Sequence, residues 1–245
     1  MAETERPTKE EFQRHKNEEE QHKRENPLRD VILGGQDGLV NALGIILGVS
    51  AATSSGKILV AAVIAATFAE SLSMGAVAYT SALSQKAYYD SEKSKEEEEI
   101  EKTPKMEAEE VRQIYENKGF KGKVLEEIVD TITSDKKLWV DTMMREELNL
   151  QKVDTKQVLK SSVIVTISTA IGHIIPLLPF FFVLPRTGLI VSVILSAVVL
   201  FAVGAYQAIS LVGSWWKSGV RMLLIGLAAA FIGFFIAKLF NVSSA

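Results

Sequence analysis

The chain has 245 residues, of which 47% are hydrophobic and 23% are charged, and its formal net charge is -3 at pH 7. The absence of cysteine excludes disulfide bonds, thiolate metal sites and cysteine nucleophiles. The small net charge conceals a division into strongly charged and almost uncharged segments, so the total says little about binding partners.

Residues 1–30 are polar throughout and contain nine of the thirty acidic residues of the chain. They lack the apolar core of a signal peptide, and their many glutamates are atypical of a transit peptide. We therefore expect a polar N-terminal segment without a cleavable signal, and membrane insertion through internal spans.

Five apolar stretches follow, each about long enough to cross a hydrocarbon core of about 30 Å as a helix. We expect these spans over residues 31–52, 57–84, 158–184, 188–212 and 219–240. This organisation places transmembrane helices 1 and 2 in residues 31–84, a charged segment in residues 85–157, and transmembrane helices 3 to 5 in residues 158–245.

The distribution of basic residues orients these spans. Seven Lys and Arg residues lie in residues 1–30 and fourteen in residues 85–157, whereas the first and third short loops contain only Lys57 and Arg186. By the positive-inside rule, the amino terminus and the charged segment are cytoplasmic, and five spans place the carboxy terminus outside.

Only two of the thirty acidic residues fall within the spans, Asp37 and Glu70. An ionisable residue inside a hydrocarbon-length helix is costly, and is a functional hypothesis by default. Counted by helical rise from the expected span ends, both carboxylates lie about 10 Å from the cytoplasmic face. The nearby glycines Gly34 and Gly38 have the four-residue spacing that indicates close approach to another helix.

Met74 follows Glu70 by four residues and so returns to within about 40° of the same helix face. A carboxylate oxygen beside a thioether sulfur suits a transition metal better than Mg²⁺ or Ca²⁺, which prefer shells of oxygen. We therefore predict an intramembrane cation or proton path formed by Asp37, Glu70 and Met74. The alternative is that both carboxylates are protonated and hydrogen-bonded between helices. For His173, in the third span, proton relay and helix packing are both open.

The charged segment, residues 85–157, is predicted to contain three helices. The first continues from the second span and stops before Pro104, because the residue preceding a proline avoids the helical conformation. The second ends at Gly119, since glycine is the usual helix terminator. The third has a candidate break near Asp135.

Two pairs of glutamates in this segment have a three-residue spacing that places each pair on one helix face. If the helices on either side of Pro104 are antiparallel, the two pairs face each other. A later Met-Met-x-x-Glu motif repeats the combination of thioether and carboxylate. On spacing alone, the more common interpretation is that the glutamates form a solvated acidic face and that the two methionines belong to a hydrophobic core. The candidate metal ligands are Glu96, Glu99, Glu107, Glu110, Met143, Met144 and Glu147.

Four sequence blocks, QDGLVNALGIILGVSAA, SLSMGAVAY, EEEEIEKTPKMEAEE and WVDTMMREEL, resemble the vacuolar iron transporter family in their order and spacing. The resemblance extends from residue 29 to about residue 240. It implies a homodimer with the transport path between protomers, movement of ferrous iron out of the cytosol, and proton antiport.

Position by position, the resemblance matches the family's membrane aspartate and membrane methionine to Asp37 and Met74. It also assigns iron binding to the seven candidate ligands of the charged segment, which favours metal binding over a solvated acidic face. One departure concerns the second span, where the family glutamate aligns with Ala66. The carboxylate of this chain, Glu70, lies one turn later on the same helix face.

We therefore expect an all-α membrane protein with five transmembrane helices and a cytoplasmic three-helix metal-binding domain inserted between the second and third. The expected function is secondary transport of Fe²⁺ out of the cytoplasm by proton antiport, with Mn²⁺, Co²⁺ or Zn²⁺ as lesser substrates. We expect no enzymatic activity, no prosthetic group and no nucleic-acid partner.

The membrane is expected to be either a prokaryotic plasma membrane or a vacuolar-type membrane, where such transport serves metal storage or detoxification. The alternative function is a membrane-anchored metal sensor or buffer. In that case the charged segment binds metal, and the spans only anchor the chain and hold a dimer together.

Overall fold

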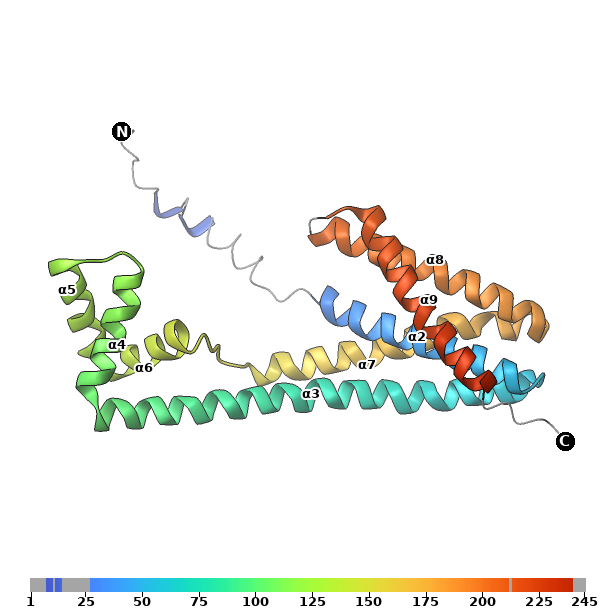
Figure 1. Ribbon diagram of the computed structural model, residues 1–245, viewed down its shortest axis with the longest axis horizontal. Helices are drawn as coiled ribbons and strands as arrows, with labels where there is room; N and C mark the ends of the chain where they lie inside the picture. The colour runs from blue at the N-terminus through green and yellow to red at the C-terminus, as the bar shows by residue number, and fades with distance from the viewer. Residues whose placement is uncertain (1–7, 11, 15–26, 212, 240–245) are drawn as a thin grey trace. The chain divides into compact units, whose positions relative to one another are not determined.

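The computed structural model describes residues 8–10, 12–14, 27–211 and 213–239 (Figure 1). Within these residues the protein is all-helical and has no strand. Five of the described helices are long and apolar enough to cross a membrane, which confirms the five expected spans. They are α2 (Leu28–Ala52), α3 (Gly56–Lys102), α7 (Thr155–Leu177) continued by the 3-10 turn η2 (Leu178–Phe181), α8 (Pro185–Leu211) and α9 (Trp215–Leu239).

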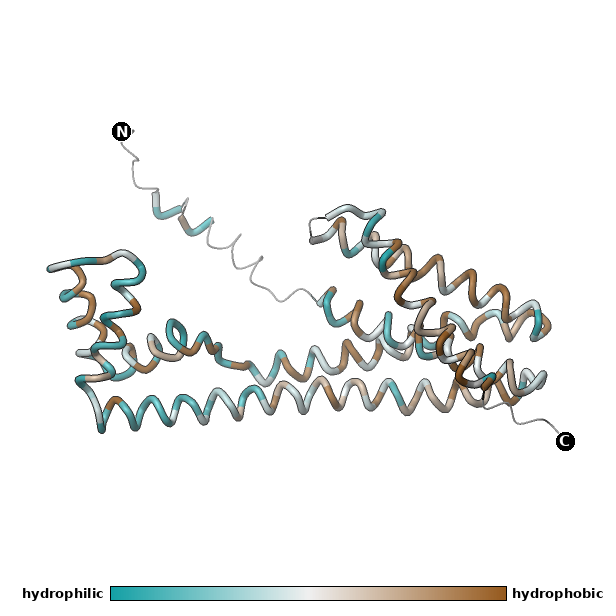
Figure 2. Tube along the Cα trace, in the orientation of Figure 1, coloured by the Kyte–Doolittle hydropathy of each residue, from teal (hydrophilic) through white to brown (hydrophobic). Residues whose placement is uncertain are grey.

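The chain divides into two compact units, which we call unit 1 (residues 1–74 and 163–245) and unit 2 (residues 75–162). Helix α3 contributes its first part to unit 1 and the remainder to unit 2. Apolar residues predominate along α8 and α9, and polar residues along α4 and the last part of α3 (Figure 2). Besides its parts of α3 and α7, unit 2 holds α4 (Pro104–Asn117), α5 (Gly122–Thr133), α6 (Lys136–Thr142) and the π-helical turn η1 (Met143–Glu147).

Helix α2 supplies residues to each of the hydrophobic clusters of unit 1. Leu39 packs in a cluster with residues of α8 and α9, and Leu43 in a second cluster with α8 and α9. Ile46 packs with residues of α3 and α7. Because these side chains are three or four residues apart, they cover one broad side of the helix. Burial of this apolar side makes α2 the centre of the unit.

Helices α2 and α7 cross at very short distance through glycines. A Cβ atom at Gly38 would lie 2.2 Å from the carbonyl oxygen of Thr169, and one at Gly172 would lie 2.4 Å from the carbonyl oxygen of Gly35. Such distances are far below van der Waals contact, so no side chain fits at either position. The spacing of Gly34 and Gly38 predicted this approach, and small residues are what allow two membrane helices to come so near.

Unit 2 has a separate hydrophobic core. In α5, Leu125, Val129 and Ile132 are four and three residues apart and therefore share one face. This face is buried against Val111 of α4 and Trp139 of α6. The candidate site of unit 2 is built on the helices that this core holds together.

The third helix predicted for the charged segment is divided. Helix α5 ends at Thr133, and α6 begins after Asp135, whose Oδ1 accepts hydrogen bonds from the backbone N–H groups of Lys137 (2.9 Å) and Leu138 (3.3 Å). This capping side chain satisfies the first free donors of a new helix and so favours a helix start at this position. In place of three helices, residues 85–157 hold the end of α3, then α4, α5, α6 and the π-helical turn η1, and finally the first residues of α7.

Candidate functional site

Three carboxylates of unit 2 lie together at the turn between α3 and α4. One oxygen each of Glu96, Glu99 and Glu107 lies within 4.8 Å of the other two. Helix α3 ends at Lys102, and Pro104 occupies the first turn of α4, where a proline is well tolerated because its missing N–H would have no helical partner. The sequence-predicted reversal at this proline thus brings the two glutamate-bearing faces together.

Two carboxylates of this cluster are almost completely buried. Glu96 and Glu107 are each only 6% exposed. Within the described residues, no hydrogen-bond donor reaches Oε2 of either side chain. Buried polar atoms in proteins almost always have a partner, and unpaired buried charge is costly. A bound cation would satisfy both oxygens at once.

Burial and repulsion between carboxylates raise the pKa values of Glu96, Glu107 and Glu147. Burial, followed by repulsion from Glu147, Glu107, Glu99 and Glu110, raises the pKa of Glu96 to about 7. Burial, followed by repulsion from Glu110, Glu99 and Glu147, raises the pKa of Glu107 to about 7. The pKa of Glu147 is raised by desolvation and then by Glu110 and Glu99. All five predicted glutamates therefore belong to one electrostatic group.

Met143 and Met144 lie in the hydrophobic core of unit 2. They are 0% and 1% exposed and belong to the hydrophobic core, in the same cluster as Ile100 and Val111. This burial agrees with the methionine-core reading of the sequence. Their role as sulfur ligands stays a prediction.

The π-helical turn η1 determines how the Met-Met-x-x-Glu motif is presented. The N–H of Leu148 donates to the carbonyl of Met143 (3.1 Å), five residues earlier instead of four. The turn closes where Asn149 has a positive φ of 52° and the N–H of Leu150 donates to the carbonyl of Met144 (2.8 Å). Asparagine tolerates this left-handed conformation better than most residues. Single π-turns are rare and are often found at functional sites.

A second group of ionisable residues lies in the membrane-spanning helices of unit 1. Oε2 of Glu70 on α3 is 2.8 Å from Nε2 of His173 on α7. Asp37 on α2 interacts electrostatically with both of them. The side-chain amide of Asn41 donates to Oδ2 of Asp37 at 3.4 Å. Met74, one turn beyond Glu70 on α3, is partly buried.

The glycine crossing positions this second group. A Cβ atom at Gly38 would also lie 2.7 Å from Nδ1 of His173, so the imidazole packs directly against the backbone that follows Asp37. His173 itself is 0% exposed. Sequence reasoning left its role open and did not connect it to Glu70, which is 103 residues away. The available signal was an ionisable residue inside a span, the same signal that singled out both carboxylates.

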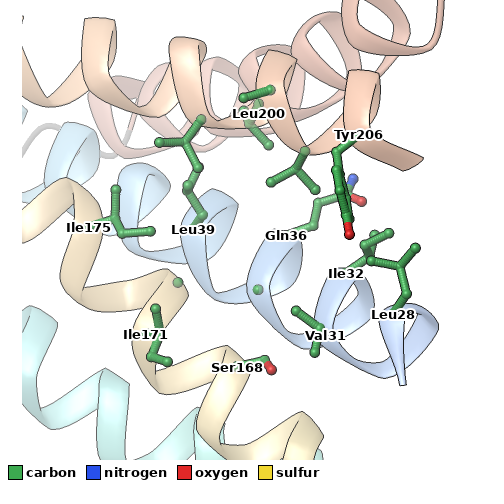
Figure 3. A pocket seen from close by; sticks show the side chains of 15 residues that line it. Leu28, Val31, Ile32, Gln36, Leu39, Ser168, Ile171, Ile175, Leu200 and Tyr206 are labelled. Atoms are coloured by element: carbon green, nitrogen blue, oxygen red, sulfur yellow. The ribbon is translucent and has the colours of Figure 1, made fainter. Parts of the chain in front are cut away.

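Helices α2, α7 and α8 also line a half-open cavity of about 390 Å³ (Figure 3). Leu39, Ile171, Ile175 and Leu200 contribute apolar side chains to it, and no Asp, Glu, Lys, Arg or His lines it. None of the candidate site residues therefore belongs to this cavity. Carboxylate and imidazole side chains, of the type that can bind a cation, therefore lie in the two ionisable groups and do not line this cavity.

Comparison with known proteins gives consistent similarities over most of the chain. The model of the VIT family matches residues 28–238. "Vacuolar iron transporter 1" of Eucalyptus grandis is 33% identical over 212 residues, which is 86% of this chain and 85% of the relative. "Vacuolar iron transporter 1" of Arabidopsis thaliana is 32% identical over 213 residues, covering 86% and 85%. "Protein CCC1" of Saccharomyces cerevisiae is 28% identical over 221 residues, covering 86% and 68%.

Proposed function

Because this chain belongs to the VIT family and is a multi-pass integral membrane protein, we propose that it is a secondary transporter that moves ferrous iron out of the cytoplasm. The names of its relatives, which are iron transporters of vacuoles, support iron as cargo and a vacuolar-type membrane as one location. Mn²⁺, Co²⁺ and Zn²⁺ are proposed as lesser substrates, since carboxylate ligands accept several divalent ions.

The observation that carries the proposal is the burial of Glu96 and Glu107 beside Glu99, where no donor among the described residues reaches Oε2 of either side chain. We place this cluster on the cytoplasmic side, where it captures the metal and supplies it to the membrane path. Glu110, Glu147 and the two methionines of η1 complete the ligand set. Near neutral pH, part of this group holds protons, and a divalent cation can displace them.

The membrane path is proposed to run through Asp37, Glu70 and Met74. Carboxylates exchange a metal ion for protons when the two sides of the membrane differ in pH, which gives proton antiport. The partial exposure of Asp37 and Glu70 in the single chain, together with exposed Asn41, supports a homodimer. Polar side chains in a span rarely face lipid, so a second protomer is the natural cover for this face.

The decisive experiment uses purified full-length protein in liposomes with an acidic lumen. Uptake of Fe²⁺ is followed by quenching of a trapped fluorescent chelator under reducing conditions. We expect uptake that collapses when the pH gradient is abolished. We also expect it to be lost in the double variant Asp37→Ala and Glu70→Ala and kept in Ser196→Ala, a buried polar position of α8. Undiminished flux in the double variant rules out the proposed path.

A second candidate, a membrane-anchored sensor or buffer, is favoured by one observation. Unit 2 has its own hydrophobic core and its own carboxylate cluster. A metal-binding sensor or buffer needs both features, and a transporter can have them as well. Metal binding by the full-length protein without flux in the same liposomes would establish this alternative.

A further inference from the structure

His173 makes two hydrogen-bonding contacts while being 0% exposed. Its Nδ1 is 3.0 Å from the backbone carbonyl oxygen of Thr169, one turn earlier on α7. Its Nε2 is 2.8 Å from Oε2 of Glu70 on α3. The imidazole is thus held by its own helix on one side and presented to the intramembrane carboxylate on the other.

The contact with Thr169 determines which nitrogen carries hydrogen. A carbonyl oxygen is only an acceptor, so Nδ1 must be the donor. The 2.8 Å contact between Nε2 and Oε2 of Glu70 then needs a second proton, on Nε2 or on Oε2, because neither a bare ring nitrogen nor a carboxylate can donate. An ion that takes the place of this proton meets the lone pair of Nε2. Histidines that bind metal ions nearly always have this arrangement, in which one ring nitrogen donates to a carbonyl or carboxylate and the other ligates the metal.

The separation of the two facing atoms also suits a shared ion. Metal–nitrogen and metal–oxygen distances of about 2.1 Å, with an angle of 90° to 110° at the metal, place two ligand atoms about 3.0 to 3.4 Å apart. Nε2 of His173 and Oε2 of Glu70 are 2.8 Å apart, so an adjustment of a few tenths of an ångström admits the ion. Asp37 is near enough to contribute charge to the same place.

We propose that His173 is a ligand of the transported cation: its Nε2 and the carboxylate of Glu70 bind the ion together, in a subsite that includes an imidazole nitrogen. The proposal rests on the proposed transport function. It gives the carboxylate at position 70 a ligand partner on another helix. An imidazole also shifts the preference of an oxygen-rich path toward Zn²⁺, Co²⁺ and Fe²⁺ and away from Mn²⁺.

The first experiment detects the ligand directly. The full-length protein, purified with a histidine-free tag, carries His15→Gln and His22→Gln, so that His173 is its single imidazole. One equivalent of Cu²⁺ is added, and pulsed electron paramagnetic resonance is used to look for modulation by the remote imidazole nitrogen. We expect this signature, and we expect His173→Gln to abolish it. Its absence before His173 is changed overturns the proposal.

The second experiment tests whether His173 binds the transported ion or only links α3 to α7 through its hydrogen bond to Glu70. Uptake of Zn²⁺ and Mn²⁺ into liposomes is compared between the unchanged chain, His173→Gln and the control Ser196→Ala, a buried hydroxyl on α8 without a partner among the described residues. We expect the ratio of Zn²⁺ to Mn²⁺ uptake to fall about 10-fold or more in His173→Gln and to stay constant in Ser196→Ala. An unchanged ratio in His173→Gln, with both fluxes reduced equally, means that the Glu70–His173 bond only ties α3 to α7, and overturns the proposal.

The two proposals fail in different ways. If the unchanged chain moves no metal but shows the imidazole signature, the transport function is wrong and the His173 subsite stands as a binding site. If the chain moves metal and lacks the signature, only the His173 subsite is wrong.

Discussion

The two ionisable groups of this protein differ in whether their carboxylates have hydrogen-bond partners. In unit 2, five glutamates repel one another, and among the described residues two of their buried oxygens have no hydrogen-bond donor. In unit 1, a carboxylate on α3 is hydrogen-bonded to an imidazole that its own helix already holds. The first group therefore lacks partners within the described residues, whereas the second has a hydrogen bond that a bound cation would have to replace. The strong attraction of the unit 2 glutamates for a cation would suit capture of the metal. The hydrogen bond between Glu70 and His173, which can re-form when the metal leaves, would suit its release.

The largest effect is expected from breaking the second group without touching the first. Gly38→Leu would place its Cβ 2.2 Å from the carbonyl oxygen of Thr169 and so force α2 away from α7. We expect flux to be lost and the thermal midpoint in detergent to fall, with a cost of about 1–3 kcal/mol or more. Zn²⁺ binding by the glutamates of unit 2, measured by calorimetry, should persist.

The matched control for this variant is Gly233→Ala on α9, where nothing lies within 4 Å of the added atom. Flux and thermal midpoint should be kept or slightly improved, because alanine favours a helix over glycine. Wild-type flux in Gly38→Leu would show that the close crossing of α2 and α7 is dispensable.

The next effect concerns metal affinity in unit 2. Because the pKa values of Glu96 and Glu107 are about 7, cations must displace protons below that pH. We expect the apparent dissociation constant for Zn²⁺ to rise about tenfold per pH unit for each displaced proton between pH 7 and pH 5. Calorimetric titration in two buffers of different ionisation enthalpy measures the number of protons released. A constant affinity for Zn²⁺ between pH 7 and pH 5 would contradict the displacement of protons from Glu96 and Glu107.

A third test uses the stability of the metal-free protein. The folded state holds protons on Glu96 and Glu107 up to about pH 7, whereas the unfolded chain releases them near pH 4.5. This contribution to stability is therefore present below pH 4.5 and is lost as the pH rises to about 7. At about 1.4 kcal/mol per pH unit, the loss should be about 3 kcal/mol for either group taken alone. The double variant Glu96→Gln and Glu107→Gln should flatten the pH dependence of the thermal midpoint, and added metal should restore stability only in the unchanged chain.

The smallest expected effect probes the support beneath the cluster. Asp135→Ala removes the cap of α6, the helix that leads into η1, and should cost about 1 kcal/mol. Asp135→Ser keeps an oxygen at the capping position and should recover most of that loss. Both changes are measured by chemical denaturation of metal-free protein. Zn²⁺ affinity should be unaltered, and a large change in it would mean that the register of η1 depends on the cap.

Much of this architecture could be predicted from local sequence patterns. The spans follow from apolar length, the reversal at Pro104 from a backbone restriction, and the glycine crossing from residue spacing. The juxtaposition of Glu96, Glu99 and Glu107 needed only that reversal and a helical period. Each of these signals is contained within a few turns of the chain, which explains why each could be recognised in isolation.

The remaining features depend on relations that no local pattern records. The pairing of Glu70 with His173 joins residues far apart in the chain, and it depends on how α3 and α7 pack. The burial of Met143 and Met144 is decided by the core of unit 2, since a methionine serves equally well as ligand or filler. The π-turn that carries them has no composition that distinguishes it from an α-helix.

That turn has a consequence for how the chain tolerates change in length. A ring closed five residues back contains one residue more than an α-helical ring, and one residue corresponds to about 100° of rotation around the axis. Deleting Arg145, which is not among the seven candidate ligands, would remove that extra residue and keep all seven ligands in the chain. The direction in which Glu147 points would nevertheless change, so the proposed ligand set depends on the length of this turn as well as on its residue types.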